Sequence, residues 1–204
     1  MTLYDSFFRV TQPNPFCASR LRPGTIPFIF PPDQSLEQVV ERLLAHHGLG
    51  QIVGPHGTGK STLLTTLLPA LEQSGRTALA TTLQEGQRRL PRNFYGAVRR
   101  TREAIAAIDG FDNLGFWSRH HVKSLCRRHG CGLVVTSHRS VGLPDLFRTT
   151  IDESLAGRVI ERLQSGFPPL VAVADVAERL TRHRGNLREA LFDLYDLYEQ
   201  RRLG

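Results

Sequence analysis

The sequence predicts an α/β fold, in which a parallel β-sheet carries helices on both faces and a small helical region follows. Two observations predict it. Short apolar runs alternate with amphipathic stretches through the middle of the chain, whereas the end of the chain contains only helical patterns. The short runs are apolar on both sides, as are strands buried inside a parallel sheet.

The predicted elements follow from this alternation. Strands are expected at residues 50–53, 77–83, 104–108 and 132–136. Core helices are expected at 36–46, 60–73, 93–102 and 113–129, because apolar side chains recur there at helical spacing. Three more helices are expected at 154–163, 171–183 and 187–201.

These elements divide the chain into three regions. Residues 1–35 are rich in proline, which excludes a helix or a central strand, so we expect an extended segment that buries Phe28 and Phe30. Residues 36–150 form the predicted α/β core. Residues 151–204 form a predicted helical lid, with an apolar stripe along its last helix.

The composition excludes a membrane-inserted protein. No apolar run approaches the roughly 20 residues that span a bilayer. Asp5 and Arg9 interrupt the apolar start of the chain, which argues against a signal peptide and favours the cytoplasm.

The cysteines indicate neither disulfides nor a metal site. Cys17, Cys126 and Cys131 are too few for a disulfide framework. Cys126 and Cys131 lie close to His129, but no second pair of zinc-type ligands follows. We expect buried structural cysteines.

The charge favours a polyanionic partner such as DNA. The net charge is +7 and nearly all basic residues are arginines, which are densest between residues 88 and 102. Phe94 and Tyr95 lie among them, and such a mixture can grip phosphates and stack on bases. The same pattern is equally typical of a helix whose arginines face solvent and whose two aromatic side chains pack in the core.

A phosphate-binding loop is the most specific motif in the chain. The segment from Gly54 to Ser61 matches G-x-x-x-x-G-K-[ST] and lies between a predicted strand and a predicted helix. Glycines let consecutive backbone N–H groups face phosphate oxygens. Lys60 is expected to reach the β- and γ-phosphates and Ser61 to bind Mg²⁺. The nucleotide-binding residues are predicted to be Gly54, Pro55, His56, Gly57, Thr58, Gly59, Lys60, Ser61 and Thr62.

Asp109 is the predicted second metal ligand. It ends the apolar strand at 104–108, and the carboxyl edge of a parallel sheet is where ligands bind. A carboxylate there fits the Walker B role, holding Mg²⁺ beside Ser61.

If the bound triphosphate is hydrolysed, a further residue must activate the attacking water, and the sequence identifies that residue less directly. Gly110 follows Asp109, where many such ATPases have glutamate, and the next carboxylate is Asp112. The run Asp109-Gly110-Phe111-Asp112 resembles the D-G-h-D pattern of NACHT and other STAND NTPases, which implies that Asp112 is the base. An N-terminal cap of the following helix is the alternative use of Asp112.

Further polar residues end the fourth predicted strand. Ser137 and His138 lie where related enzymes contact the γ-phosphate or the attacking water, and Arg139 resembles an arginine of STAND proteins. A plain strand-to-loop transition is the alternative. Arg148 lies where AAA+ proteins often carry an arginine finger for a neighbouring subunit, which implies a nucleotide-dependent oligomer.

In the lid, Gly185 to Arg188 resembles the sensor-2 motif of AAA+ proteins. Asn186 and Glu189 read as a capping box, which is the structural explanation of this segment. Arg188 then lies in the first helical turn, where positive charge is mildly unfavourable and phosphate contact would offset that cost. The resemblance therefore implies a catalytic role for Arg188.

Together these motifs resemble the AAA+/STAND branch of P-loop NTPases over residues 25–202. The resemblance implies a three-layer α/β/α core, ATP and Mg²⁺ as ligands, and an ATP-hydrolysing switch or small motor. It also places the segment at 23–32 beside the adenine. A protein or DNA client is expected, but no sequence motif names it.

Two other functions stay open. A regulator that hydrolyses ATP slowly or not at all, and recruits a protein or DNA partner, is compatible with Gly110 after Asp109. A small-molecule kinase is less favoured, because a strand at 77–83 separates the phosphate loop from Asp109 and the helical region is C-terminal.

Overall fold

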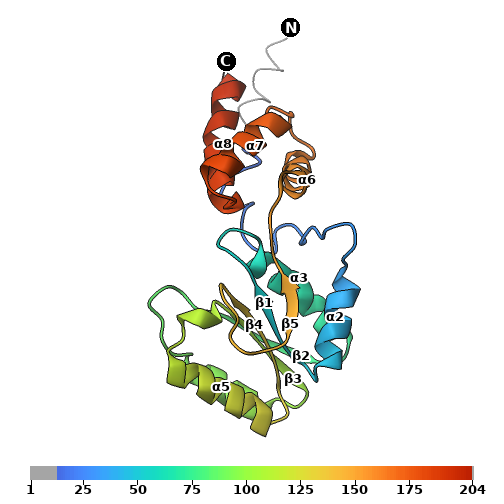
Figure 1. Cartoon of the computed structure of the whole chain (residues 1–204), viewed down its shortest axis with the longest axis vertical. Coiled ribbons are helices and arrows are strands. Elements are labelled where there is room, and N and C mark those ends of the chain that lie inside the picture. Colours follow the sequence, from blue (N-terminus) through green and yellow to red (C-terminus); the bar gives the residue numbers. More distant parts are fainter. Residues whose placement is uncertain (1–12, 204) are drawn as a thin grey trace. The chain divides into compact units, whose positions relative to one another are not determined.

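The computed structural model describes residues 13–203 (Figure 1), so Asp5 and Arg9 lie outside the described residues. The chain forms two compact units. The core unit contains Phe30–Pro55 and Gly59–Thr149. The helical unit contains the described residues 13–29, His56–Thr58 and the chain from Thr150 onward.

The core unit is built on one parallel sheet of five strands in the order β2-β3-β4-β1-β5. The strands are β1 (Leu49–Val53), β2 (Thr77–Thr82), β3 (Ala104–Asp109), β4 (Gly132–Ser137) and β5 (Asp145–Arg148). This arrangement confirms the predicted α/β fold with a parallel sheet. Because β1 lies between β4 and β5, the strand order reverses there, and ligands of such sheets bind outside the carboxyl ends at that point.

Helices cover both faces of the sheet, as predicted. They are α2 (Leu36–Ala45), α3 (Lys60–Gln73), α4 (Arg92–Arg100) and α5 (Phe116–Arg128), with a 3-10 turn η1 (Phe111–Asn113) before α5. One apolar cluster joins α4 and α5 to alternate residues of β3 and β4. On the opposite face α3 presents fully buried leucines, and Figure 1 shows α5 and α3 on opposite sides of the sheet.

Two parts of the core differ from the sequence prediction. Strand β5 is absent from that prediction, because only Leu146 and Phe147 are buried in its four residues. It lies at the edge of the sheet beside β1. The helix expected from residue 113 begins at Phe116, because Leu114 turns into the core with extended backbone and Gly115 caps α5.

The helical unit contains α6 (Glu153–Gln164), α7 (Val173–Arg182) and α8 (Leu187–Leu203), close to the predicted ranges. The Asp152 side chain caps α6 by accepting from the Leu155 N–H. Residues near the start of the chain pack on α8. The Phe16 ring lies edge-on to Tyr198 at 5.8 Å, and the Asn14 amide donates to the Tyr195 carbonyl at 3.0 Å and to Glu199 at 2.7 Å.

Phe28 and Phe30 are half-buried rather than fully buried. Within the core unit, the Phe30 ring packs edge-on against Phe147 of β5 at 5.7 Å. This contact gives the edge strand an aromatic neighbour from the proline-rich segment. Among residues 13–203, no helix has the length and apolar character that a membrane span requires.

Candidate functional site

The loop between β1 and α3 carries the predicted phosphate-binding residues and begins at the carboxyl end of β1. Gly59 precedes α3 with φ +91°, a left-handed conformation that glycine adopts without strain. No side chain caps α3 and its first turn holds no acidic residue, so its first backbone N–H groups are left for another acceptor. A helix start of this kind attracts phosphate.

Lys60 lies buried beneath this loop, with 8% of its surface exposed. Its ammonium donates to the carbonyls of Gly54 at 2.7 Å and Pro55 at 2.5 Å. Burial lowers the pKa of Lys60, and the negative charges of Asp112 and Asp109 oppose that shift. The ammonium of Lys60 is therefore held by the loop carbonyls, and the charges of both carboxylates act on it.

Side chains from two elements converge on the carboxylate of Asp109. The Ser61 hydroxyl of α3 donates to Oδ1 at 2.9 Å, and the Thr136 hydroxyl of β4 donates to the same oxygen at 2.6 Å. The structure thus brings together the two predicted metal ligands, Ser61 and Asp109. Hydroxyl and carboxylate oxygens are the donors that Mg²⁺ prefers, so this pair fits the ion.

Asp112 and His138 form a second polar pair beside Asp109. Asp112 Oδ2 accepts from the His138 backbone N–H at 2.9 Å and lies 2.5 Å from the ring Nδ1. Burial raises the pKa of Asp112, but the hydrogen bonds from His138 outweigh it and the pKa is below its ordinary value. Asp112 Oδ1 is buried and has no hydrogen-bond partner among the described residues.

The alternative explanation of Asp112 as a helix cap is wrong. The N-cap of α5 is Gly115, and η1 is preceded by Gly110. The Asp112 carboxylate bonds to His138, the residue that follows β4, rather than to its own helix. Its position is therefore fixed by the contacts with His138 and not by the start of α5.

Gly110 is required by the backbone at this point. Its φ is +75°, and a Cβ there would lie 2.9 Å from the Leu83 carbonyl oxygen. A glutamate in this position would be strained. The backbone conformation at Gly110 is thus a local steric reason for the absence of a glutamate directly after Asp109.

Thr136 is the site residue that the sequence prediction missed as a contact of the carboxylate. Besides donating to Asp109, its hydroxyl accepts from the Gly110 N–H at 2.8 Å. Ser137, which was predicted to contact the γ-phosphate or the attacking water, is fully buried and donates to the Arg139 carbonyl at 2.6 Å. Since side chains alternate along a strand, Thr136 and Ser137 face opposite ways, and only the known sheet order shows which one meets Asp109.

Two of the predicted arginines, Arg148 and Arg188, make contacts within their own units. Arg148 ends β5, is mostly exposed and pairs with Asp145 at 2.6 Å. Arg188 belongs to the helical unit, where its guanidinium lies 6.0 Å from the Phe192 ring centre. At the start of α8, Asn186 accepts from the Glu189 N–H at 3.3 Å, as a helix cap does.

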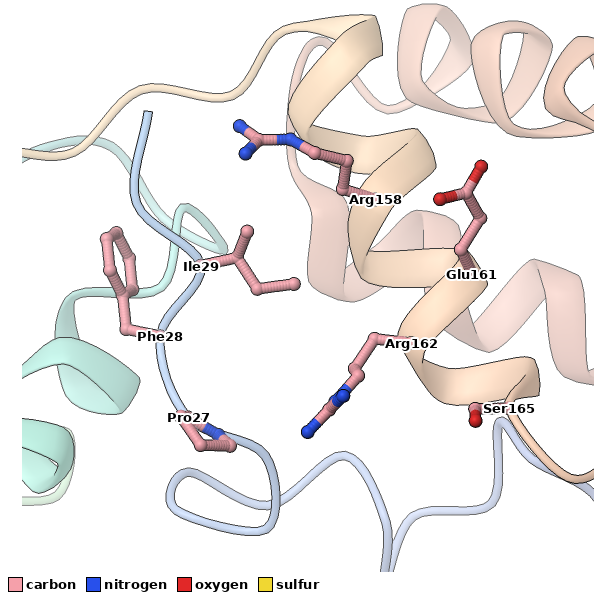
Figure 2. Close-up of a pocket in the computed structure, with 7 residues that line it drawn as sticks. All are labelled: Pro27, Phe28, Ile29, Arg158, Glu161, Arg162 and Ser165. Carbon is pink, nitrogen blue, oxygen red and sulfur yellow. The ribbon is translucent and has the colours of Figure 1, made fainter. Parts of the chain in front are cut away.

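The helical unit contains a pocket of about 490 Å³ (Figure 2). Pro27, Phe28 and Ile29 form one wall, and α6 with its end forms the other. Figure 2 shows the guanidinium groups of Arg158 and Arg162 extended towards the Pro27–Ile29 segment. The lining therefore combines an apolar wall with charged side chains, which are Arg158, Arg162 and Glu161.

The cysteines are free thiols, and Cys126 and Cys131 are buried as predicted. Both belong to the apolar cluster beneath α4 and α5. Within residues 13–203, no group of three or more His, Cys, Asp or Glu side chains is arranged to hold a metal ion.

Comparison with known proteins identifies the fold. No protein-family model matches the chain, and no curated protein matches it. Among solved structures, the chain is similar to AMPPCP-bound DnaA from Aquifex aeolicus, with a TM-score of 0.54 and 17% identity over 80% of this chain and 61% of that one. The chain has the fold of a P-loop AAA+ ATPase domain.

Two further solved structures have a similar fold. The replication initiator DnaA bound to AMPPCP and single-stranded DNA has a TM-score of 0.56 and 16% identity over 84% of this chain and 63% of that one. The Walker-type ATPase PABY2304 of Pyrococcus abyssi has a TM-score of 0.56 and 12% identity over 93% of this chain and 75% of that one. The chain thus spans less than two thirds of either DnaA structure.

Proposed function

We propose that this chain binds ATP with Mg²⁺ at the Gly54–Thr62 loop and hydrolyses it, acting as a nucleotide-dependent switch or small motor. One observation carries the proposal. The Ser61–Asp109 pair and the Asp112–His138 pair lie at one edge of the sheet, beside the buried ammonium of Lys60. The AMPPCP bound by the DnaA structures supports ATP as the nucleotide.

In this proposal, different residues bind the phosphates and the metal ion. The loop N–H groups and Lys60 bind the phosphates, and Ser61 and Asp109 would hold Mg²⁺, which neutralises phosphate charge when bound. Thr136 holds the Asp109 carboxylate at 2.6 Å and so orients it for that task. These residues bind and position the nucleotide rather than transfer protons.

Asp112 is the proposed residue that orients the attacking water. Its Oδ2 is fixed by His138, while the buried Oδ1 has no partner among the described residues and can accept a hydrogen bond from water. The lowered pKa of Asp112 keeps it ionised at neutral pH. It therefore acts as an acceptor that aligns water, in the manner of the water-positioning residues of other P-loop enzymes.

The same observation favours a second candidate function. A carboxylate with a lowered pKa is a weak proton acceptor, and Gly110 excludes the usual glutamate. A regulator that binds ATP but turns it over slowly, and recruits a partner in the bound state, is the alternative. In either function we propose a protein or DNA client, a helical unit that reports the nucleotide state, and oligomers formed in the nucleotide-bound state.

The experiment that tests the proposal measures ATP binding and steady-state hydrolysis by the purified chain, with and without DNA. Hydrolysis in the presence of Mg²⁺ supports the enzyme, and an increase with DNA identifies the client as nucleic acid. Binding without turnover supports the regulator. Failure to bind ATP would overturn both functions.

A further inference from the structure

Two of the largest exposed apolar side chains of the core unit are neighbours at the start of α5. Phe116 is 73% exposed and Trp117 is 80% exposed. Their rings contact each other edge-on at 5.4 Å, and neither belongs to the apolar cluster beneath α5. Since the fold does not bury them, these two rings form an apolar platform that is available to a partner.

A strongly basic loop adjoins this platform. The loop that precedes α4 reaches the start of α5, where the Gly115 N–H donates to the Arg88 carbonyl at 3.2 Å. Arg88, Arg89 and Arg92 are exposed. Neither the stretch 86–102 nor the stretch 113–130 contains an aspartate or a glutamate. An anionic partner would therefore meet no repulsive side chain from these two segments.

Helices α4 and α5 belong to one face of the sheet and pack against each other. Phe94 and Val98 of α4 share an apolar cluster with Val122 and Leu125 of α5. The Tyr95 ring packs 5.5 Å from His121 across the two helices. Exposed basic residues on this surface, beyond the loop, are Arg99, Arg100, Arg127 and Arg128.

The structure also reassigns the aromatics in this region. Phe94 is 8% exposed and packs in the core, so it cannot stack on a base, although the sequence places it among the arginines. Phe116 and Trp117 are the aromatic side chains that accompany the basic loop in space. Exposed aromatic faces beside arginines are the combination that binds unpaired bases and their phosphates.

We propose that this surface, formed by Phe116, Trp117, the 86–92 loop and the exposed arginines of α4 and α5, binds single-stranded nucleic acid. Trp117 and Phe116 stack on bases and the arginines contact phosphates. A duplex buries its base faces and offers none to the platform, which favours a single strand. This proposal rests on the proposed function in one respect, because it specifies the class of the client. The binding itself requires neither ATP binding nor hydrolysis.

Trp117 is the only tryptophan of the chain, so its fluorescence reports the contact directly. Titration of the full chain without nucleotide uses oligo(dT) and oligo(U) of equal length, the matching duplex, and anionic lipid vesicles. We expect quenching by a single strand, and whichever of the two binds more tightly identifies DNA or RNA. Three results would overturn the proposal. They are neither quenching nor binding with any single strand, tighter binding to the duplex than to the single strand, and binding to the vesicles alone.

Variants separate stacking from charge. Trp117→Ala is expected to weaken binding of a labelled oligonucleotide about tenfold, and Trp117→Phe to retain most of the affinity. Arg88→Ala with Arg89→Ala is expected to lower the slope of log affinity against log salt by about 0.7 for each phosphate that the variant no longer neutralises.

The matched control is Arg22→Ala with Arg182→Ala, which removes the same charge from exposed positions of the helical unit. Because all of these side chains are exposed, circular dichroism spectra should match the wild type. If Trp117→Ala binds as tightly as the wild type, or the two arginine pairs have equal effects, the proposed surface is wrong. ATP binding, measured separately, distinguishes this result from failure of the proposed function.

Discussion

The carboxylate of Asp112 lies 2.5 Å from the ring Nδ1 of His138 and accepts the His138 backbone N–H at 2.9 Å. Both contacts use the same oxygen, so Oδ2 is fully engaged and Oδ1 is left buried without a partner among the described residues. One carboxylate thus joins the loop after β3 to the end of β4 while keeping an acceptor available. This division suits a residue that orients a small polar molecule.

Asp112→Asn is therefore expected to stop ATP turnover while leaving ATP affinity within about threefold of the wild type. Asparagine keeps the shape but replaces one carboxylate oxygen with a donor, which removes the negative acceptor that aligns water. Turnover is measured by phosphate release and affinity by nucleotide titration. Asp145→Asn is the control for removal of a carboxylate elsewhere in the core unit, and unchanged turnover in Asp112→Asn would assign the role to another residue.

Thr136→Val tests the residue that holds Asp109. The change removes a buried hydroxyl that donates to Asp109 and accepts from Gly110, which leaves the Gly110 N–H without its acceptor. We expect a loss of about 1–3 kcal/mol in the free energy of unfolding, and slower hydrolysis at saturating ATP. Thr136→Ser retains the hydroxyl and should recover most of both. A valine variant as stable and active as the wild type would remove Thr136 from the site.

Lys60→Ala is expected to weaken binding of the triphosphate about tenfold to a hundredfold, because alanine cannot make the charge-assisted hydrogen bond to phosphate. The chain offers a well-matched control, since Lys123 is its only other lysine. Lys123 donates to the Val141 carbonyl on α5's side of the core and has no predicted role in the phosphate loop. Equal decreases in affinity for Lys60→Ala and Lys123→Ala would show a general charge effect and contradict the loop assignment.

Gly110→Glu introduces a glutamate directly after Asp109, the position at which many P-loop ATPases carry one. The φ of +75° and the approach of the Leu83 carbonyl predict strain for any side chain here, of about 1–3 kcal/mol in the free energy of unfolding. We expect a destabilised protein with no gain in turnover, measured by denaturant unfolding and phosphate release. Faster hydrolysis in this variant would show that the backbone can adapt and that Asp112 is dispensable.

Sequence patterns predicted the parts of the site that depend on spacing along the chain. The phosphate loop is one continuous motif, and Asp109 follows an uninterrupted apolar strand that is buried along its length. Contacts between strands could not be predicted in this way. The role of Thr136 depends on β4 lying next to β3, and no local sequence pattern indicates that pairing. Phe94 was ambiguous for the same reason, since burial depends on which helix face meets the sheet.

Strand β5 was missed because its four residues carry too little periodicity to be recognised. Its position depends on a non-local partner, since the Phe147 ring contacts Phe30 more than a hundred residues away. The start of α5 was misplaced because Leu114 is apolar and fits the helical pattern while its backbone is extended. Both errors arise where tertiary packing decides the conformation.

The helical unit allows a test by pH. Arg201 donates to both carboxylate oxygens of Asp175, at 2.5 and 2.9 Å, and these bonds hold the pKa of Asp175 below its ordinary value of 3.8. A lowered folded-state pKa means that the pair stabilises the protein above pH 3.8 and that this stability is lost as the pH falls through the folded-state pKa.

Asp175→Asn should therefore lower the unfolding midpoint of the helical unit at neutral pH and have a shrinking effect as the pH falls below 3.8. Denaturant unfolding of both proteins across this range measures the difference. Glu178→Gln is a suitable control, because its pairs with Arg179 and Arg182 are more exposed and should contribute less. A difference between wild type and Asp175→Asn that does not change with pH would show that the side chain acts through its cap contact with the Ala172 N–H rather than through its charge.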